Sequence, residues 1–431
     1  MAETKTESVP TIDHKPHAAF FRQSGWLMIA NIAGGMMTLG VHPLNKHIPD
    51  GEYTAFGVLL MVVACLPTTP LQMVFAQQSA LALATGRERQ LAGMIRLAWL
   101  WTFIVWALAS AAVFLFQGAI VERWQLPGAA GLLVTLPLLL VSLWAPMFTG
   151  VLQGRQDFFW MGWSSILGGT GRLAMAAFFV LALGFGAAGM MAGALIGVAF
   201  AAGIAIWRTR DLWALRAESF DLKSLLRQVM PLVFGFAACQ FMFTSDTMFA
   251  KAYFSPDAMK PYVAAGTLSR GLLWLVMPLA AVMFPKIVQS SVKREKNNLF
   301  GLVVLGTGVL GICGLAGLWL TGPWVVKILY KASDLGGTMA LIPWYAGAMV
   351  PLALANVMVN DLLARSRFSV VPWMVLLAVA YGFTLPWMLN HFPGRQEVAL
   401  QTLGAFNLLL FGICSWFAWG VKEKAKMENG R

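Results

Sequence analysis

Residues 128–150 read GAAGLLVTLPLLLVSLWAPMFTG and contain no charged side chain. A helix of this length, rising about 1.5 Å per residue, spans the roughly 30 Å hydrocarbon core of a bilayer. Similar runs fill the chain: 58% of its 431 residues are hydrophobic and only 12% are charged, whereas soluble domains carry about 25% charged residues. Only helices and closed barrels satisfy their backbone groups in lipid, and these runs are too long for barrel strands. The sequence therefore predicts an all-α polytopic membrane protein.

The alternation of apolar runs and basic loops predicts about twelve transmembrane helices. Their expected bounds are 24–44, 54–80, 92–116, 128–150, 158–182, 185–207, 229–250, 262–287, 298–320, 341–364, 369–390 and 397–420. Most of the 31 Lys and Arg residues fall in the two tails and in the loops after even-numbered spans. Because basic loops stay in the cytoplasm, we expect both termini there, with the chain in a bacterial cytoplasmic (inner) membrane.

Two halves of the chain resemble each other at an offset near 208 residues. Residues 70–94 and 278–302 align without a gap, so that Pro70 matches Pro278 and the basic loops coincide. This predicts two parallel six-helix bundles around a central cavity. The matched prolines suggest hinges in the second and eighth spans, with a static bend as the alternative. The expected division is tail 1–23, bundle 24–207, cytoplasmic linker 208–228 with a short interfacial helix, bundle 229–420 and tail 421–431.

Several classes of function lack support in the sequence. The four cysteines lie in apolar spans and the five histidines are scattered, which indicates neither a disulfide nor a metal site. No hydrolase, metalloprotease or nucleotide-binding motif is present, so we expect no enzyme activity and no cofactor. The net charge of +12 lies in short loops, which is typical of a topology signal rather than a nucleic-acid site.

Three charged residues lie at membrane depth: Arg172, Asp246 and Arg270. Such groups are costly in lipid and persist beside a cavity or a partner. We interpret both arginines as ligands for an anionic cargo, because guanidinium binds phosphate oxygens in pairs. Asp246 then serves coupling or gating together with Lys251. The alternative is that Asp246 pairs with Arg270 or Lys251 while Arg172 binds backbone carbonyls.

Uncharged polar residues inside the spans form a second group of candidates. Asn31, Gln240 and Asn356 are predicted to line the cavity and to hydrogen-bond the hydroxyl groups of the cargo. Gln77, Gln78, Asn360 and Asn407 share this pattern. The alternative for each residue is a hydrogen bond between neighbouring helices.

Residues 245–288, SDTMFAKAYFSPDAMKPYVAAGTLSRGLLWLVMPLAAVMFPKIV, carry a family resemblance, as does GVLQGRQDF at 150–158. Asp246, Lys251 and Tyr262 in the longer stretch are similar to a pattern in the polysaccharide transporter branch of the multidrug/oligosaccharidyl-lipid/polysaccharide flippase superfamily. The resemblance implies a MATE-like fold. It also implies a flippase that moves polyprenyl-diphosphate-linked oligosaccharide by alternating access for surface polysaccharide biosynthesis. Its expected partners are this lipid-linked oligosaccharide, membrane lipids, H+ or Na+, and the polysaccharide polymerase machinery.

Other members of the superfamily depart from this sequence. The lipid II flippases have fourteen spans and a more cationic first span, whereas residues 25–41 here are uncharged. A cation-coupled multidrug antiporter is the alternative transporter, but the first six spans contain no acidic residue. A membrane-embedded glycan polymerase, ligase or acyltransferase is the alternative enzyme, and the longest outer loop, 321–340, is short for a separate catalytic site.

Overall fold

The computed structural model describes residues 15–64, 66–124, 126–293, 299–329 and 335–420, and this part of the chain contains helices and no strand. Twelve of its helical segments are long and apolar enough to cross a membrane, which confirms the predicted fold class. The principal helices are α1 (Lys15–Leu39), α2 (Asp50–Ala64), α3 (Thr68–Thr85), α4 (Glu88–Leu115), α5 (Gln117–Arg123), α6 (Ala130–Gly154), α7 (Phe158–Ala177), α8 (Ala187–Arg208), α9 (Asp211–Ala214), α10 (Leu222–Tyr253), α11 (Pro256–Lys293), α12 (Leu299–Leu329), α13 (Leu335–Ala364), α14 (Val371–His391) and α15 (Gln396–Ser415). Short 3-10 or π segments lie at His42–His47, Phe178–Ala182, Phe368–Val370 and Trp416–Gly420.

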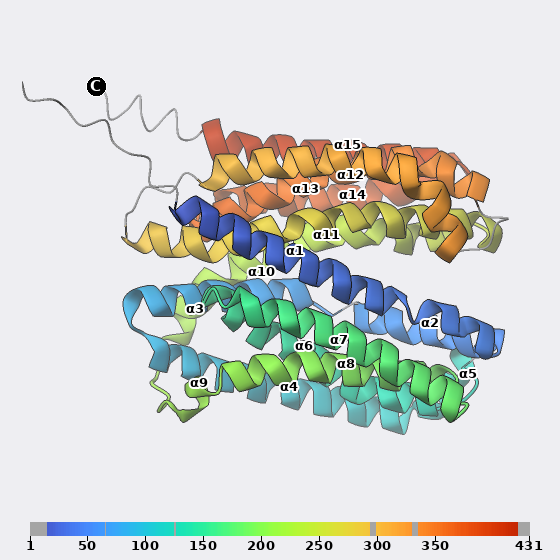
Figure 1. Ribbon diagram of the computed structural model, residues 1–431, viewed down its shortest axis with the longest axis horizontal. Helices are drawn as coiled ribbons and strands as arrows, with labels where there is room; N and C mark the ends of the chain where they lie inside the picture. The colour runs from blue at the N-terminus through green and yellow to red at the C-terminus, as the bar shows by residue number, and fades with distance from the viewer. Residues whose placement is uncertain (1–14, 65, 125, 294–298, 330–334, 421–431) are drawn as a thin grey trace, which may run out of the picture.

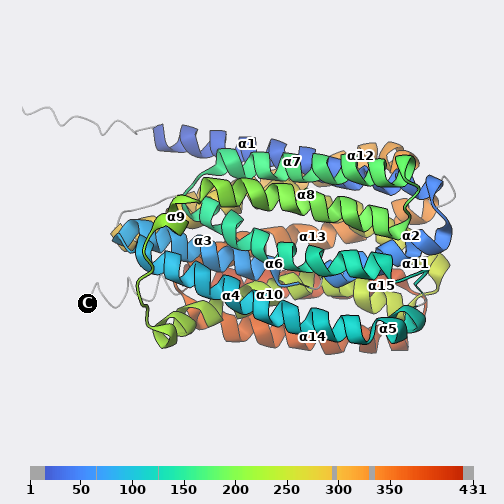
Figure 2. The ribbon, with the colours of Figure 1, turned by 90° about the horizontal axis from the view of Figure 1, so that it is seen from below.

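The helices form two groups that lie side by side (Figure 1). In the first half, α7 packs against α1 and α8, and α6 packs against α3 and α8. In the second half, α13 packs against α11, α12 and α15, and α10 packs against α14. The halves meet where α1 contacts α11 and where α3 contacts α10 and α11. Both views show the start of α1 and the end of α15 at the same end of the molecule (Figures 1 and 2), as an even number of crossings requires. We call this end the cytoplasmic end, following the predicted orientation.

Glycines allow close packing within the first half. A Cβ atom on Gly169 of α7 would lie 2.3 Å from the carbonyl oxygen of Gly34 on α1. A Cβ atom on Gly193 of α8 would lie 2.6 Å from the backbone of Ala176 on α7. Van der Waals contact between such backbones replaces the hydrophobic driving force that lipid cannot provide.

The apolar cores show that the halves join at one end only. One cluster unites the second half with residues at the cytoplasmic end of the first half, including Phe20, Leu27 and Val151. The outer end of the first half has a cluster of its own, which includes Val41 and Met190. The two bundles are therefore packed together at the end that holds the start of α1 and separate toward the opposite end. With both termini in the cytoplasm, as the basic loops predict, this arrangement faces outward.

Three segments differ in detail from the predicted spans. The second span consists of two helices, α2 and α3, on either side of residues 65–67, and Pro70 lies in the first turn of α3. Its predicted counterpart Pro278 lies inside the continuous helix α11. The helix of the seventh span, α10, begins at Leu222, because Asp221 caps it by accepting a hydrogen bond from the Lys223 backbone N–H; the apolar span within it runs over Leu225–Ala250 rather than from residue 229. The expected interfacial helix of the linker is only the four-residue α9.

Candidate transport site between the two halves

A cavity of about 480 Å³ lies between the halves, within the usual size range of ligand pockets. Three residues that the sequence analysis singled out lie in its wall: Asn31 on α1, Gln240 on α10 and Asn356 on α13. Further polar lining comes from Thr38, Thr69, Gln72, Gln153, Ser165 and Asn360. The described lining residues come from four helices of the first half (α1, α3, α6 and α7) and three of the second (α10, α11 and α13).

The amides of the wall keep hydrogen-bonding capacity for a ligand. The Asn356 Oδ1 atom accepts a hydrogen bond from Asn360 Nδ2 at 2.6 Å, and Gln240 Oε1 accepts one from Thr69 Oγ1 at 3.4 Å. Within the part of the chain that the structure describes, the amide N–H groups of Asn356 and Gln240 and the whole Asn31 side chain have no partner. Each amide donates two hydrogen bonds and accepts two, so the wall can both donate to and accept from a hydroxyl-rich ligand.

The described lining residues carry no charge. Leu27, Met73, Phe236 and Leu352 are among the apolar side chains between the amides. Neither Arg172 nor Arg270 is part of this wall, so their contact with cargo stays a prediction.

Arg270 lies one layer behind the cavity wall in a buried ion pair. Its Nη2 atom donates to Asp246 Oδ1 at 2.5 Å and to Thr247 Oγ1 at 2.7 Å. Its Nε atom donates to the carbonyl of Phe243 at 3.1 Å, and the guanidinium lies 5.6 Å from the centre of the Phe243 ring. Because Phe243 lines the cavity, one side chain separates this charge from a ligand. The structure thus shows the pair that the sequence analysis kept as its alternative.

Asp246 is fully buried and holds more than one donor. The hydroxyl of Tyr262 donates to its Oδ2 atom at 3.2 Å, and the hydroxyl of Tyr345 also donates to Oδ2. A buried carboxylate with a cationic partner and two hydroxyl donors is fully satisfied. Lys251, its predicted companion, lies on α10, but its side chain is outside the described residues, so its role stays a prediction.

Arg172 lies on α7 at the contact with α8. A Cβ atom on Gly197 would lie 2.6 Å from the Arg172 Cβ, so the absence of a side chain there makes room for the arginine. The buried Nε atom of Arg172 has no hydrogen-bond partner among the described residues. Arg172 therefore has an unused donor within the first half, as a ligand-binding role requires.

Glutamines close the cytoplasmic end of the interface. Gln77 Nε2 donates to the carbonyl of Leu363 at 3.3 Å, and Gln153 Nε2 donates to that of Ala281 at 3.1 Å. Gln156 Nε2 donates to Gln289 Oε1 at 2.8 Å. We call these three bonds the glutamine seal. Each bond joins the first half to the second.

Sequence reasoning missed most of the glutamine seal. It placed Gln77 among the weaker polar candidates, but it did not select Gln153, Gln156 or Gln289. The Gln156–Gln289 bond links a loop residue of the first half to α11 of the second. Nothing in the sequence pairs these positions, because the contact depends on the angle between the bundles.

A family model described as lipid II flippase MurJ matches residues 89–389. The chain belongs to this family. A comparison with curated proteins finds no match. The family match identifies a membrane transporter that flips a lipid-linked substrate, rather than an enzyme.

Solved structures with the same fold cover nearly the whole flippase. A MATE transporter in complex with MaD3S superposes with a TM-score of 0.80 at 13% identity, over 96% of this chain and 97% of that chain. A transporter of the MOP superfamily from Pyrococcus furiosus gives 0.75 at 12% identity, with coverages of 96% and 97%. The MATE transporter VcmN from Vibrio cholerae gives 0.73 at 13% identity, with coverages of 95% and 97%. These likenesses confirm the MATE-like fold.

The family match refines the resemblance seen in the sequence. The flippase superfamily is confirmed, whereas the polysaccharide transporter branch stays a prediction. The span count and the uncharged first span weaken a lipid II assignment, yet the matching family model is that of the lipid II flippases. The match begins at residue 89, beyond the first two spans, so it does not depend on the first span.

Proposed function

We propose that this flippase moves polyprenyl-diphosphate-linked oligosaccharide across the bacterial inner membrane for surface polysaccharide biosynthesis. The observation that carries the proposal is the uncharged, amide-lined cavity between the halves. The saccharide and diphosphate occupy this cavity while the polyprenyl chain stays in the bilayer. Rocking of the two halves then exposes the head group on the opposite side.

The chemistry of the cavity wall favours a saccharide over a cationic drug. Asn31, Gln240 and Asn356 provide unpaired amide donors that match sugar hydroxyls. A cation in the same place would lose its hydration without gaining a carboxylate, because the described wall contains no acidic residue. We therefore favour the lipid-linked saccharide over the antiporter alternative.

The diphosphate needs positive charge, and two features near the cavity supply it. Thr69 and Gln72, in the first two turns of α3, line the cavity, so the positive end of this helix faces the ligand. Arg270 lies behind Phe243, and we propose that the diphosphate draws it from Asp246. Arg172, with its free Nε donor, serves as a second ligand once the halves move.

When the diphosphate draws Arg270 away, Asp246 is left free to bind an ion, so cargo binding and ion binding become coupled. A carboxylate that loses its cationic partner in a buried site gains affinity for H+ or Na+. We propose that Asp246, with Lys251 nearby on α10, couples ion binding to movement, and that Pro70 and Pro278 act as hinges. The polymerase machinery that receives the flipped cargo is a further proposed partner.

The test is flipping of a fluorescent polyprenyl-diphosphate-linked disaccharide in proteoliposomes, with lipid II and phosphatidylglycerol as parallel substrates. Combined Asn31→Leu, Gln240→Leu and Asn356→Leu substitutions remove three sets of donors, each worth about 1 kcal/mol. We expect flipping at subsaturating substrate to fall by about a hundredfold. The matched control Thr321→Leu changes an exposed polar residue at the outer end of α12 and should leave the rate unchanged.

Two results would contradict the proposal. Unchanged flipping by the triple variant, at equal amounts of reconstituted protein, would exclude the cavity as the route. Flipping of lipid II without flipping of the disaccharide lipid would exclude the proposed cargo and place the substrate with that of the matching family.

A further inference from the structure

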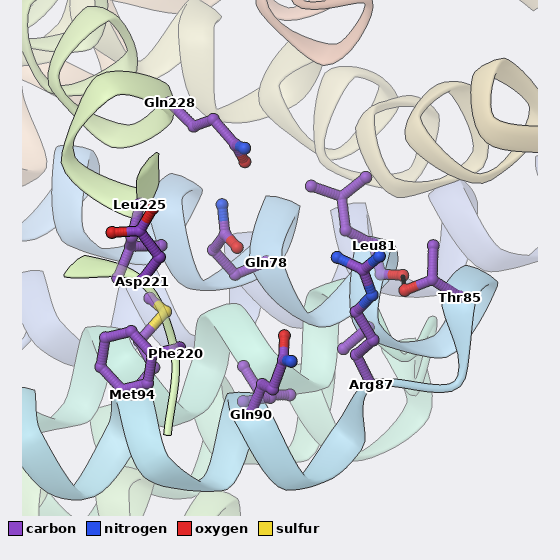
Figure 3. A pocket seen from close by; sticks show the side chains of 12 residues that line it. Gln78, Leu81, Thr85, Arg87, Gln90, Met94, Phe220, Asp221, Leu225 and Gln228 are labelled. Atoms are coloured by element: carbon purple, nitrogen blue, oxygen red, sulfur yellow. Dashed lines mark hydrogen bonds between the residues drawn. The ribbon is translucent and has the colours of Figure 1, made fainter. Parts of the chain in front are cut away.

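A second cavity of about 400 Å³ opens at the cytoplasmic end of the molecule. We call it the cytoplasmic cleft. One wall comes from α3 and α4 of the first half, and the other from residues 220–228 at the start of α10 (Figure 3). It shares no lining residue with the central cavity.

The cleft and the central cavity lie along the same helix, on opposite sides of the glutamine seal. Thr69 and Gln72 of α3 line the central cavity, Gln77 makes the bond to Leu363, and Gln78 lines the cleft. On α10, Gln240 lines the central cavity and Gln228 lines the cleft. Polar side chains therefore lie at both chambers on a helix of each half, and on α3 Gln77 and Gln78 follow Gln72 between them.

The polar groups of the cleft have few partners. The side chains of Gln78, Arg87, Gln90 and Gln228 make no hydrogen bond to any residue that the structure describes, and the Nε2 atom of Gln78 is buried without a partner. Figure 3 shows the Gln78 and Gln228 amides directed toward each other from α3 and α10, with the Gln90 amide directed into the same space. Unsatisfied buried donors such as this one indicate a missing ligand or water.

The types of side chain define the ligand. A guanidinium binds phosphate oxygens through charge-assisted hydrogen bonds, and Arg87 provides one at the edge of the cleft. The three glutamine amides donate to and accept from hydroxyl groups. Asp221 accepts the Lys223 backbone N–H through Oδ1, which leaves Oδ2 to accept from a sugar hydroxyl. This combination fits a sugar phosphate.

We propose that the cytoplasmic cleft is a second head-group site, which holds a sugar-phosphate head group while the central cavity faces outward. This inference rests on the proposed function, because the head group in the cleft is the next cargo to be moved. When the halves rock and the Gln77 bond to Leu363 opens, the head group passes along α3 to Gln72 and Thr69. One chain therefore binds two head groups in the outward-facing state.

The experiment fixes the outward-facing state and counts bound ligands. In a chain with Cys65, Cys239, Cys313 and Cys414 replaced by alanine, Gln156→Cys and Gln289→Cys are joined by a short bismaleimide, which holds the seal closed. Native mass spectrometry of this protein in nanodiscs then counts molecules of polyprenyl-diphosphate-N-acetylglucosamine. Parallel titrations with N-acetylglucosamine 1-phosphate show whether the cleft takes its ligand from the membrane or from solution.

We expect two molecules per locked chain. Gln78→Leu with Gln90→Leu should leave one molecule, and Arg87→Leu should weaken the cleft site at least tenfold. Arg227→Leu is the matched control, since it removes an exposed arginine at the same end that does not line the cleft, and it should leave two. Asn31→Leu with Gln240→Leu should also leave one molecule, bound at the cleft.

The opposite pattern would overturn the inference. A single molecule in the locked chain, lost with the Asn31 and Gln240 substitutions and indifferent to the cleft substitutions, would show that the cleft binds nothing. Failure of the proposed function is a separate result: it would be seen as absence of flipping by the unlocked chain, with ligand still counted at the cleft.

Discussion

Substituting Asp246 by leucine should strongly destabilise the flippase. The carboxylate is fully buried and accepts hydrogen bonds from Arg270 at 2.5 Å and Tyr262 at 3.2 Å, as well as from Tyr345. Its removal leaves a guanidinium with only 17% of its side-chain surface exposed and without a counter-charge. Breaking one partner of a buried pair costs about 3–5 kcal/mol, and we expect Asp246→Leu to lie in this range.

The companion variant separates stability from transport. Replacing both charges, as Asp246→Leu with Arg270→Met, removes the unpaired cation, and apolar replacements of buried pairs are often neutral. We expect the double variant to regain most of the lost stability. It should still fail to flip diphosphate-linked substrate, because Arg270 is the proposed phosphate ligand.

Denaturant unfolding of the purified protein in detergent measures these differences, and a double-mutant cycle isolates the coupling between the two residues. Asp211→Leu is the control: its carboxylate bonds Arg155 at the surface, with 55% of the side chain exposed. Exposed pairs contribute only about 0–1 kcal/mol. A loss below about 1 kcal/mol in Asp246→Leu, or additive losses in the double variant, would refute the reasoning.

Three further predictions concern packing, gating and pH. Gly169→Val should lower the yield of folded protein and its melting temperature, because a Cβ atom there would lie 2.3 Å from a carbonyl oxygen of α1; unchanged melting would contradict the close contact. Gln156→Leu weakens the seal, so labelling of Cys239 in the cavity by a membrane-impermeant maleimide from the cytoplasmic side should rise several-fold, and an unchanged rate would exclude a gating role. The hydrogen bond from Arg155 lowers the pKa of Asp211. The pair's contribution to stability is therefore fully present above the ordinary carboxyl pKa of about 3.9 and is lost as pH falls through the lowered pKa of the folded state. Arg155→Gln should change the free energy of unfolding at pH 7 by less than about 1 kcal/mol, and the change should shrink as pH falls below the ordinary carboxyl pKa; a change that grows in acid would contradict this.

The fold followed from the sequence because lipid leaves few choices. Apolar runs of helical length and asymmetric basic loops were enough to place twelve spans, and the structure has twelve candidates. The sequence did not reveal the break between α2 and α3, because Pro70 is equally compatible with a hinge or a static bend within one span. Proline is compatible with both outcomes, and packing around the cavity decides between them.

The sequence indicated which types of residue form the candidate site, but it indicated only some of their positions. Asn31, Gln240 and Asn356 lie in the cavity wall, because amides inside apolar spans favour polar surroundings, and their binding of cargo stays a prediction. Arg270 could have paired with Asp246 or with a ligand, and the structure shows the pair. The glutamine seal and the cytoplasmic cleft escaped prediction, since both depend on how one half sits against the other.

Photo-crosslinking from the cavity wall tests the central claim most directly. A diazirine-bearing amino acid at Asn356 is compared with the same group at Phe383, whose side chain is 76% exposed on the outer surface of α14, in membranes that contain polyprenyl-diphosphate-linked disaccharide with a radiolabelled sugar. We predict that the label attaches at position 356 and not at 383, and that unlabelled lipid-linked disaccharide competes. Label at 383 with none at 356 would show that the sugar does not enter the space between the halves.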